Sequence, residues 1–258
     1  MMQRRRILGM ACLALLMAAG VARSVEEGAA KQILELRLYT VAAGEKRQRL
    51  VDFLAKVAIP AWNRIGIETV GVFEFADGKR PDLYVLLPHK SLEAFATSRQ
   101  RLLADAEFLK AGAPYLDLPK KDPLYRRVES SVMLAFDQCP KVEVPKKAET
   151  RVFQLRTYES HSLKKADKKI DMFNAGGEIA LFRECGMQPV FFGQTLAGAK
   201  MPNLTYMLVF ENDEARQANW KKFIESAGWK RLKGLPVYRD TVSGITNLFL
   251  RPIACSQL

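Results

Sequence analysis

The first regular pattern in the chain is an alternation of apolar and polar residues within Ile33–Tyr39, and a period of two predicts a β-strand. Apolar residues then recur at helical spacing and predict an amphipathic helix that contains Leu50, Phe53, Leu54 and Val57. Pro60 should begin a new turn of this helix or bend it. Gly66 lies where the helix should end.

Two more strands and a second helix follow. The apolar segments 69–75 and 83–87 predict a hairpin-like pair joined by an Asp-Gly turn. Ser91 is a favourable N-cap with an acid in the next turn, so the second helix should begin there, and Asn212 is the corresponding N-cap later in the chain. The expected apolar face of that helix holds Leu92, Phe95, Leu102, Leu103 and Ala106. With a last strand near 128–136, the order is βαββαβ, the ferredoxin-like unit.

The whole pattern occurs twice. Segment 35–39 is matched 119 positions later by segment 154–158, and three further matches follow in the same order at nearly the same offset. Such self-similarity indicates an internal repeat. The proline-containing, charged segment 138–150 predicts a linker between two modules, which we place at 33–137 and 151–253.

Each module should carry its helices on one face of an antiparallel sheet, which leaves the other face in need of cover. Two tandem copies can place these open faces together and share one core. We therefore expect an α+β fold, in which two ferredoxin-like modules pack as an intramolecular dimeric α+β barrel.

The first 22 residues are typical of a targeting signal. Three arginines, Arg4 to Arg6, precede an apolar run, and small residues occupy positions 20 and 22, which are −3 and −1 from the expected cleavage site. This order predicts a secretory signal cleaved near Ala22, hence an exported protein of the periplasm or cell envelope. The arginines leave both the general and the twin-arginine route open, and the alternative is an uncleaved anchor. No later apolar run is long enough to span a bilayer, so we do not expect an integral membrane protein after signal removal.

The composition is that of an ordinary globular protein, with 48% hydrophobic and 26% charged residues. The formal charge of +12 falls to +9 without the signal arginines. Lysine pairs gather mainly in the second half and suggest a polyanion-binding face, with a merely solvated surface as the alternative; they are Lys146-Lys147, Lys164-Lys165, Lys168-Lys169 and Lys221-Lys222. No nucleic-acid-binding motif occurs, and no nucleic acid partner is expected.

The cysteines and histidines suggest little chemistry. Cys139 and Cys255 each follow the last strand of a module, so they would form a disulfide if those ends meet. The alternative is that no disulfide forms, and Cys185 should be a buried thiol. His89 and His161 have no nearby ligand residues, so we expect no metal and no cofactor, and we place both in surface loops.

The order of these motifs resembles the NIPSNAP family. The resemblance rests on Glu-Leu-Arg-x-Tyr at the start of a module, a helix ending in Gly66, Gly71-Val72-Phe73, and a helix rich in Arg and Leu. It covers both modules. The second module departs from it, because Gln154 replaces the opening glutamate and a Gly-Gly pair interrupts its first helix. The resemblance implies the dimeric α+β barrel fold and no agreed catalytic chemistry.

Alternation along the first strand separates Leu36 and Leu38 from the polar residues between them. We expect the leucines to face the helices and the polar side chains to face the space between the sheets. A buried arginine requires a partner, and Glu35 or an acid of the other module should supply it to Arg37. The predicted inter-sheet pocket, for a small anionic or carbonyl ligand, comprises Glu35, Arg37, Tyr39, Gln154, Arg156, Tyr158 and His161. The alternative is a structural polar network that holds the two sheets in register.

Several functions remain open at this point, because no nucleophile, phosphate-loop or zinc-protease motif occurs. The first is an exported, non-catalytic ligand-binding or scaffold protein with an envelope or protein partner. The second is a small cofactor-independent enzyme of the oxygenase or isomerase type, working in the inter-sheet pocket. The third is a polyanion binder. Outer sheet edges also leave room for a homodimer.

Overall fold

The computed structural model describes residues 30–258, so the predicted signal at 1–22 lies outside the described residues. The first module comprises β1 (Ile33–Thr40), α1 (Glu45–Phe53), the π-helical turn η1 (Leu54–Ala58), α2 (Ile59–Arg64), β2 (Gly71–Phe75), β3 (Leu83–His89), α3 (Leu92–Leu103), α4 (Ala106–Leu116) and β4 (Arg127–Ala135). The second comprises β5 (Val152–Glu159), α5 (Leu163–Phe173), α6 (Glu178–Glu184), β6 (Gln188–Ala197), β7 (Asn203–Phe210), α7 (Asp213–Glu225), α8 (Ala227–Gly234), the 3₁₀ turn η2 (Pro236–Tyr238) and β8 (Gly244–Pro252).

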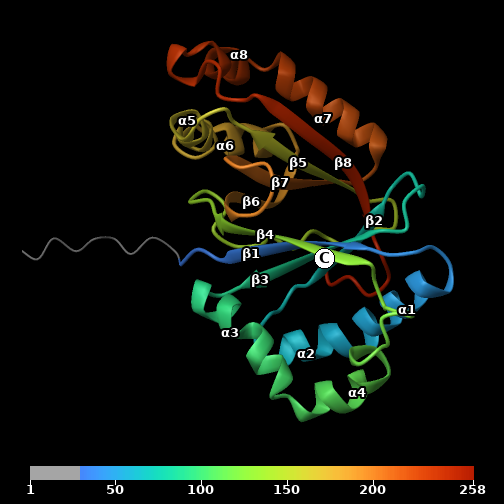
Figure 1. Ribbon diagram of the computed structural model, residues 1–258. Coiled ribbons are helices and arrows are strands. Elements are labelled where there is room, and N and C mark those ends of the chain that lie inside the picture. Colours follow the sequence, from blue (N-terminus) through green and yellow to red (C-terminus); the bar gives the residue numbers. More distant parts are fainter. Residues whose placement is uncertain (1–29) are drawn as a thin grey trace, which may run out of the picture.

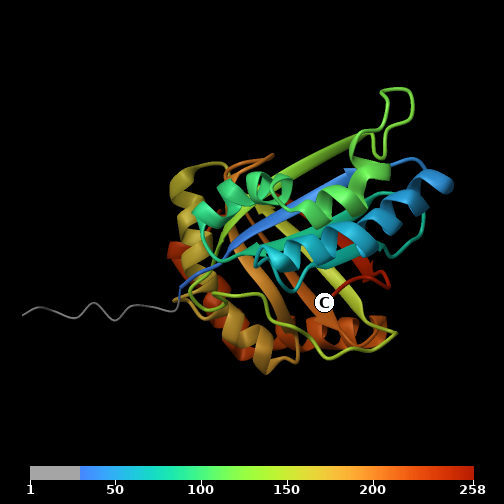
Figure 2. The same ribbon diagram turned by 90° about the horizontal axis from the view of Figure 1, so that it is seen from below.

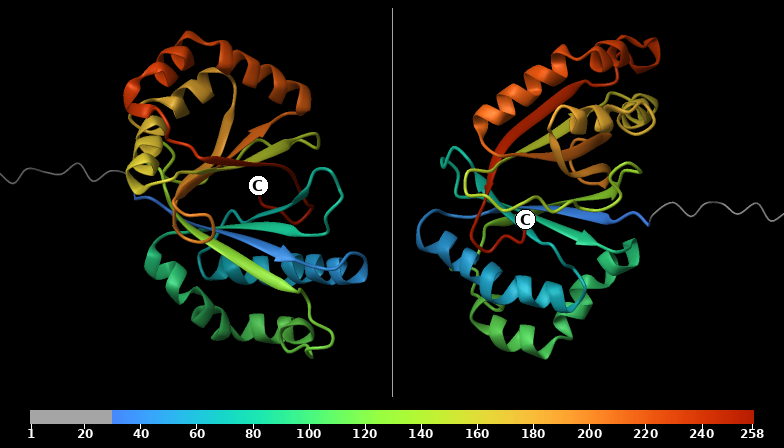
Figure 3. Two further views of the ribbon diagram at one scale, coloured as in Figure 1. Left: turned by 45° about the horizontal axis from the view of Figure 1, so that its top comes forward. Right: turned by 180° about the vertical axis from the view of Figure 1, so that it is seen from behind.

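The eight strands form one closed antiparallel barrel in the order β1-β3-β2-β8-β5-β7-β6-β4. Each module supplies four neighbouring strands, and the modules join where β2 pairs with β8 and β4 pairs with β6. Helices α1–α4 cover one side of the barrel and α5–α8 the opposite side (Figures 1 and 3). The expected α+β fold with two tandem modules is confirmed. Closure pairs the edges of the eight strands within residues 30–258 with one another, so a homodimer would have to use another surface of this part of the chain.

Strands β1, β3, β5 and β7 are buried along most of their length, whereas β4 and β8 keep several exposed residues. The barrel interior is apolar and holds, among others, Leu34, Leu36, Phe73, Phe153 and Leu155. The opposite face of β1 packs against the helices of its module through Tyr39 and Val41. The expected orientation of the strands is therefore wrong: the leucines point into the barrel and the polar trio of β1 points at the helices. The two sheets together enclose a small space that is mostly filled by apolar side chains. The polar faces of β1 and β5 therefore pack against the helices of their own modules.

The ends of the two modules cross to the opposite module. Residues after β4 join the core beneath the second module's helices, where Cys139 is buried. Residues after β8 pack against the first module, where Cys255 contacts the core and Ser256 accepts a hydrogen bond from the Val72 amide at 3.0 Å. The predicted Cys139–Cys255 disulfide is therefore not formed, and Cys139, Cys185 and Cys255 are free thiols. Burial, with Glu143 nearby, raises the pKa of Cys139 to about 12.

The helices begin where their caps predict, although each module has one helix more than expected. Ser91 accepts a hydrogen bond from the Ala94 amide at 3.1 Å, and Asn212 caps α7 in the same way. Helices α4 and α8 were not predicted from the spacing. Pro60 lacks the N–H that a regular helix needs, and the ladder widens to π geometry at η1 just before it, so the helix continues across the proline.

The predicted linker 138–150 contains no helix or named strand. Figure 2, seen from below, shows the first module's helices lying across its strands.

None of the helices within residues 30–258 has the length and apolar character needed to cross a membrane.

Candidate functional site

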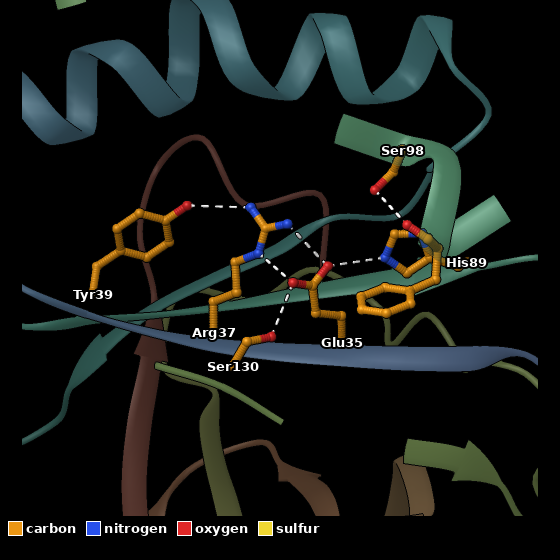
Figure 4. A network of polar contacts seen from close by, with 7 residues as sticks. Glu35, Arg37, Tyr39, His89, Ser98 and Ser130 are labelled. Atoms are coloured by element: carbon orange, nitrogen blue, oxygen red, sulfur yellow. Dashed lines mark hydrogen bonds and ion pairs between the residues drawn. The ribbon is translucent and has the colours of Figure 1, made fainter. Parts of the chain in front are cut away.

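A charged network occupies the helix-facing side of β1 (Figure 4). Arg37 donates from Nε to Glu35 Oε1 at 2.6 Å and from Nη2 to Glu35 Oε2 at 3.0 Å. Its Nη1 lies 3.4 Å from the Tyr39 hydroxyl oxygen. A two-residue spacing on a strand puts these three side chains on one face, which is why they meet. The expected Glu35–Arg37 pair is confirmed.

The two strands beside β1 complete the network. On β3, His89 is completely buried and its Nε2 lies 3.1 Å from Glu35 Oε2. On β4, the Ser130 hydroxyl donates to Glu35 Oε1 at 2.9 Å. The prediction that His89 lies in a surface loop is wrong, because β3 extends to His89, which pairs with Ile33 on β1. The register brings both residues to the network, because the residues opposite Ile33 and Arg37 share a face with Glu35.

These contacts fix the charge state of Glu35. Burial acts to raise its pKa, but hydrogen bonds from His89, Arg37 and Ser130 and the charge of Arg37 outweigh burial and lower the pKa to about 2. Glu35 is therefore a carboxylate, and His89 Nε2 must carry the proton that it donates. Burial likewise raises the pKa of Tyr39, so its hydroxyl keeps its proton at neutral pH.

Arg37 and Tyr39 border a cavity of about 510 Å³ between β1 and the helices of the first module. This volume is typical of sites for small organic ligands. The cavity is lined by Arg37, Tyr39, Phe53, Ala58, Trp62, Ser98, Arg99, Leu102, Leu103, Phe108, Tyr115, Leu116, Leu124 and Tyr125. A guanidinium has five N–H donors. Glu35 and Tyr39 engage three of those of Arg37, so within the described chain two remain for a ligand.

The equivalent face of β5 differs. Gln154 donates to Asn247 Oδ1 at 2.8 Å and accepts from Trp220 Nε1 at 2.7 Å. Arg156 lies 4.8 Å from the Trp220 ring centre, and its buried Nε has no hydrogen-bond partner among residues 30–258. Tyr206 donates to the Tyr158 hydroxyl at 3.0 Å. This face of β5 is therefore polar like that of β1, but it carries no carboxylate of its own.

The space beneath the second module's helices is packed with aromatic rings. They include Phe173, Phe182, Phe192, Tyr206, Trp220, Phe223 and Trp229. A buried ion pair lies among them, with Lys169 Nζ 2.7 Å from Glu178 Oε2. Lys169 is only 4% exposed, so this lysine does not belong to the basic surface predicted for the lysine pairs.

The seven predicted site residues therefore do not form one pocket. Glu35, Arg37 and Tyr39 lie beneath the first helix layer; Gln154, Arg156 and Tyr158 lie beneath the second. His161 is exposed in the turn after β5. A cavity of about 330 Å³ does open between the modules, but its lining includes Leu36, Leu155, Thr157 and Thr205 and none of those seven. The two modules pack against each other through the strand faces opposite the polar ones. Strand alternation separates the two faces but does not reveal which of them points to the other module.

Within residues 30–258, no cluster of three His, Cys, Asp or Glu side chains could hold a metal ion. The arrangement at β1 instead offers oriented hydrogen-bond donors beside an aromatic cavity. Such a site can bind a carbonyl or anionic oxygen and stabilise negative charge that develops on it.

Solved structures with this fold extend over most of the chain. A candidate monooxygenase from Lactobacillus acidophilus NCFM is 14% identical, with a TM-score of 0.55 over 86% of this chain and 94% of that one. A candidate monooxygenase from Fusobacterium nucleatum subsp. nucleatum is 11% identical, with a TM-score of 0.57 over 87% and 93%. An anthrone oxidase-like protein is 12% identical, with a TM-score of 0.52 over 86% and 92%. At such identities the likeness shows the fold.

No curated protein matches the sequence. The profile of one family, NIPSNAP, matches it twice, over residues 34–140 and 153–257. These two matches cover most of the chain and coincide with the two halves of the barrel. The chain belongs to the NIPSNAP family, with two family modules in tandem.

Proposed function

We propose that the first module is a binding site for a small, planar, largely apolar molecule that carries a carbonyl or weakly anionic oxygen. The observation that carries this proposal is the 510 Å³ cavity with Arg37 at its wall. Glu35 neutralises the charge of Arg37 while leaving two N–H donors free. That favours a neutral carbonyl or a single weak anion over a strongly charged ligand.

The lining supports the same ligand class. The aromatic rings offer apolar faces to a planar ligand, and the rings of Phe53, Trp62, Phe108, Tyr115 and Tyr125 all border the cavity. Tyr39 keeps its proton and can donate a second hydrogen bond to the same oxygen as Arg37. The second module, without a carboxylate partner for its arginine, is proposed to have a structural role.

An enzymatic version of this proposal uses the same cavity. Arg37 and Tyr39 would stabilise the enolate that remains when an acidic C–H bond of a bound ketone breaks and its proton passes to hydroxide from the solvent, as a cofactor-independent oxygenase or isomerase requires. The solved structures of similar fold described as candidate monooxygenases and as an anthrone oxidase-like protein make anthrone a sensible first substrate to assay. If the protein binds such a ketone without turning it over, a non-catalytic ligand-binding function is supported instead.

The binding test is calorimetric titration with 9-fluorenone, a planar ketone that does not react with thiols. Arg37→Met should weaken binding by about tenfold or more, since hydrogen bonds from a charged donor contribute about 1.5–3 kcal/mol. Arg156→Met, the same change at the matching position of β5, is the control and should leave binding unchanged.

A second variant guards against misfolding. Leu102→Trp fills the cavity from α3 without touching the Glu35–Arg37 pair, and it should also abolish binding. The proposal would be overturned if Arg37→Met and Leu102→Trp both bound 9-fluorenone as tightly as the wild type does. Oxygen consumption with anthrone, measured on the same proteins, separates catalysis from simple binding.

We also propose that the protein is exported to the periplasm or cell envelope. Support comes from the basic, apolar and small-residue segments of residues 1–22. The N-terminal sequence of protein recovered from its own host should start near Arg23. An intact Met1 would contradict export by cleavage.

A further inference from the structure

A second cavity lies between the predicted linker and the second module. It has a volume of about 880 Å³ and shares no lining residue with the cavity beside Arg37. Its walls are segment 144–148 on one side and the ends of β6 and β7 on the other, with Arg151 and Asn219 between them. We call this cavity the linker groove.

The linker groove has a fixed wall even though segment 144–148 contains no helix or strand. Before this segment, Arg183 holds Glu143 through two hydrogen bonds of 2.5 and 2.8 Å, and the Glu143 amide donates to the Val190 carbonyl at 2.9 Å. At its end, Arg151 Nε donates to the Ala148 carbonyl at 3.1 Å. The wall is thus anchored on both sides of the opening.

Arg151 is a buried cation whose guanidinium is only partly satisfied. The residue is 7% exposed, and its buried Nη1 finds no acceptor in residues 30–258. Its Nη2 donates at 3.4 Å to the main-chain oxygen of Leu258, the last residue of the printed sequence, and a carboxylate at that position offsets part of the charge. Glu211 also lines the groove, yet no Asp or Glu side chain within residues 30–258 bonds to Arg151. Buried charged groups in proteins are normally hydrogen-bonded, so the Nη1 side of this guanidinium lacks a partner.

The rest of the groove suggests what that partner is. Lys146 and Lys147 are exposed at the rim and add two positive charges. Val144, on the same wall, is 56% exposed and adds apolar surface, while Val209 and Phe210 line the opposite wall with side chains that are themselves buried. We propose that the linker groove binds a small organic anion, whose carboxylate or phosphate group pairs with Arg151 and whose apolar part packs on Val144.

Calorimetric titration of the purified protein tests this assignment, with benzoate and phenyl phosphate as separate probes that distinguish a carboxylate from a phosphate ligand. We expect saturable binding of at least one probe, weakening as salt rises. Arg151→Gln should reduce its affinity about tenfold or more, and Arg151→Lys by less, because lysine keeps the charge but loses the planar donor fork.

The exposed pair Lys146→Glu/Lys147→Glu keeps the test valid if Arg151→Gln does not fold, and it should reduce affinity at least about threefold. Lys120→Glu/Lys121→Glu makes the same charge change on an exposed loop of the first module and is the control. Arg37→Met should not change binding here, which separates this site from the cavity beside Arg37. Failure of both probes to bind, or an equal loss with the control pair, would overturn the assignment.

Discussion

The two helix–sheet layers start from the same strand motif and use its polar face in different ways. On β1, Glu35 binds Arg37 beside an open cavity. On β5, Gln154 bonds to Trp220 and Asn247, and aromatic rings pack the space. The strand registers make the comparison specific, because they show which residues occupy equivalent places in the two modules.

Three replacements change the polar network. Gln154 takes the place of Glu35; Phe210, opposite the first residue of β5, takes the place of His89; and Asn247 takes the place of Ser130. The network thereby loses its strand carboxylate and its histidine, while Arg156 keeps the charge of Arg37. Phe182 also replaces Trp62 in the repeat and contacts five other rings. A duplicated module can thus keep its scaffold while only one copy retains a polar cavity.

The largest expected effect concerns the ion pair of the second module. Glu178→Ala leaves Lys169 as a buried, unpaired cation and should lower the free energy of unfolding by about 3–5 kcal/mol. Urea denaturation measures it. The double variant Lys169→Met/Glu178→Leu removes both charges and should be much less destabilised. Asp52→Ala, which breaks an exposed pair with Lys56, should lower the free energy of unfolding far less than Glu178→Ala does. Equal losses in all three would contradict the assignment.

Acidification should separate the two buried glutamates. The pKa of Glu35 is about 2 when folded, against 4.5 as its ordinary value, so the unfolded chain takes up the proton first. The stability contributed by Glu35, about 3 kcal/mol, is present above pH 5 and is lost as the pH falls toward 2. Glu35→Gln should flatten this part of the curve of unfolding free energy against pH.

Glu178 should act with the opposite sign. Burial raises its pKa, an effect that Lys169 only partly offsets, so the folded state takes up this proton before the unfolded chain does. Its contribution to stability therefore grows as the pH falls through the raised pKa toward 4.5. Glu178→Gln should make the acid loss steeper. An unchanged slope in either variant would contradict the respective assignment.

Exchanging the residues at the equivalent positions of β1 and β5 sharpens the comparison at neutral pH. Glu35→Gln removes the carboxylate that holds Arg37 and His89 and should cost about 1–3 kcal/mol in unfolding free energy. Gln154→Glu introduces a carboxylate beside Arg156, whose Nε lacks a partner in the described chain, and should change stability by less than about 1 kcal/mol. Losses of the same size would mean that the two layers are electrostatically alike.

The smallest effect should be the same in both modules. Ser91→Ala and Asn212→Ala remove the N-caps of the equivalent helices α3 and α7, and each should cost about 1 kcal/mol in thermal or urea unfolding. A clear difference between the two would show that the modules also diverge in local helix stability, away from the polar faces.

Local patterns predicted most of the elements. Alternation predicted β1 and β5, the caps predicted the starts of α3 and α7, and the repeat predicted two modules. Helix α4 was missed because the predicted helix face ran on to Ala106, whereas α3 ends at Leu103 and the Asp105 cap starts a new helix at Ala106. Helix α8 likewise begins at its own cap, Ser226. The Glu35–Arg37 pair was predicted because both residues lie on one strand, two positions apart.

The remaining parts of the site depend on long-range pairing. His89 and Ser130 join the network only because β3 and β4 flank β1, and sequence spacing does not contain that register. The cysteine pairing was wrong for a related reason: the chain ends cross between modules when β4 pairs with β6 and β8 with β2.

The sequence by itself determined the family, the doubled module and which side chains share a strand face, because these follow from local order and from the period of two. Only the tertiary structure decided which face points into the barrel. Both faces of β1 and β5 are largely buried, and apolar side chains fill most of the closed barrel, although Thr157 and Thr205 line the small cavity between the modules. Arg37 and Arg156 therefore lie on opposite sides of the barrel, each beneath the helices of its own module.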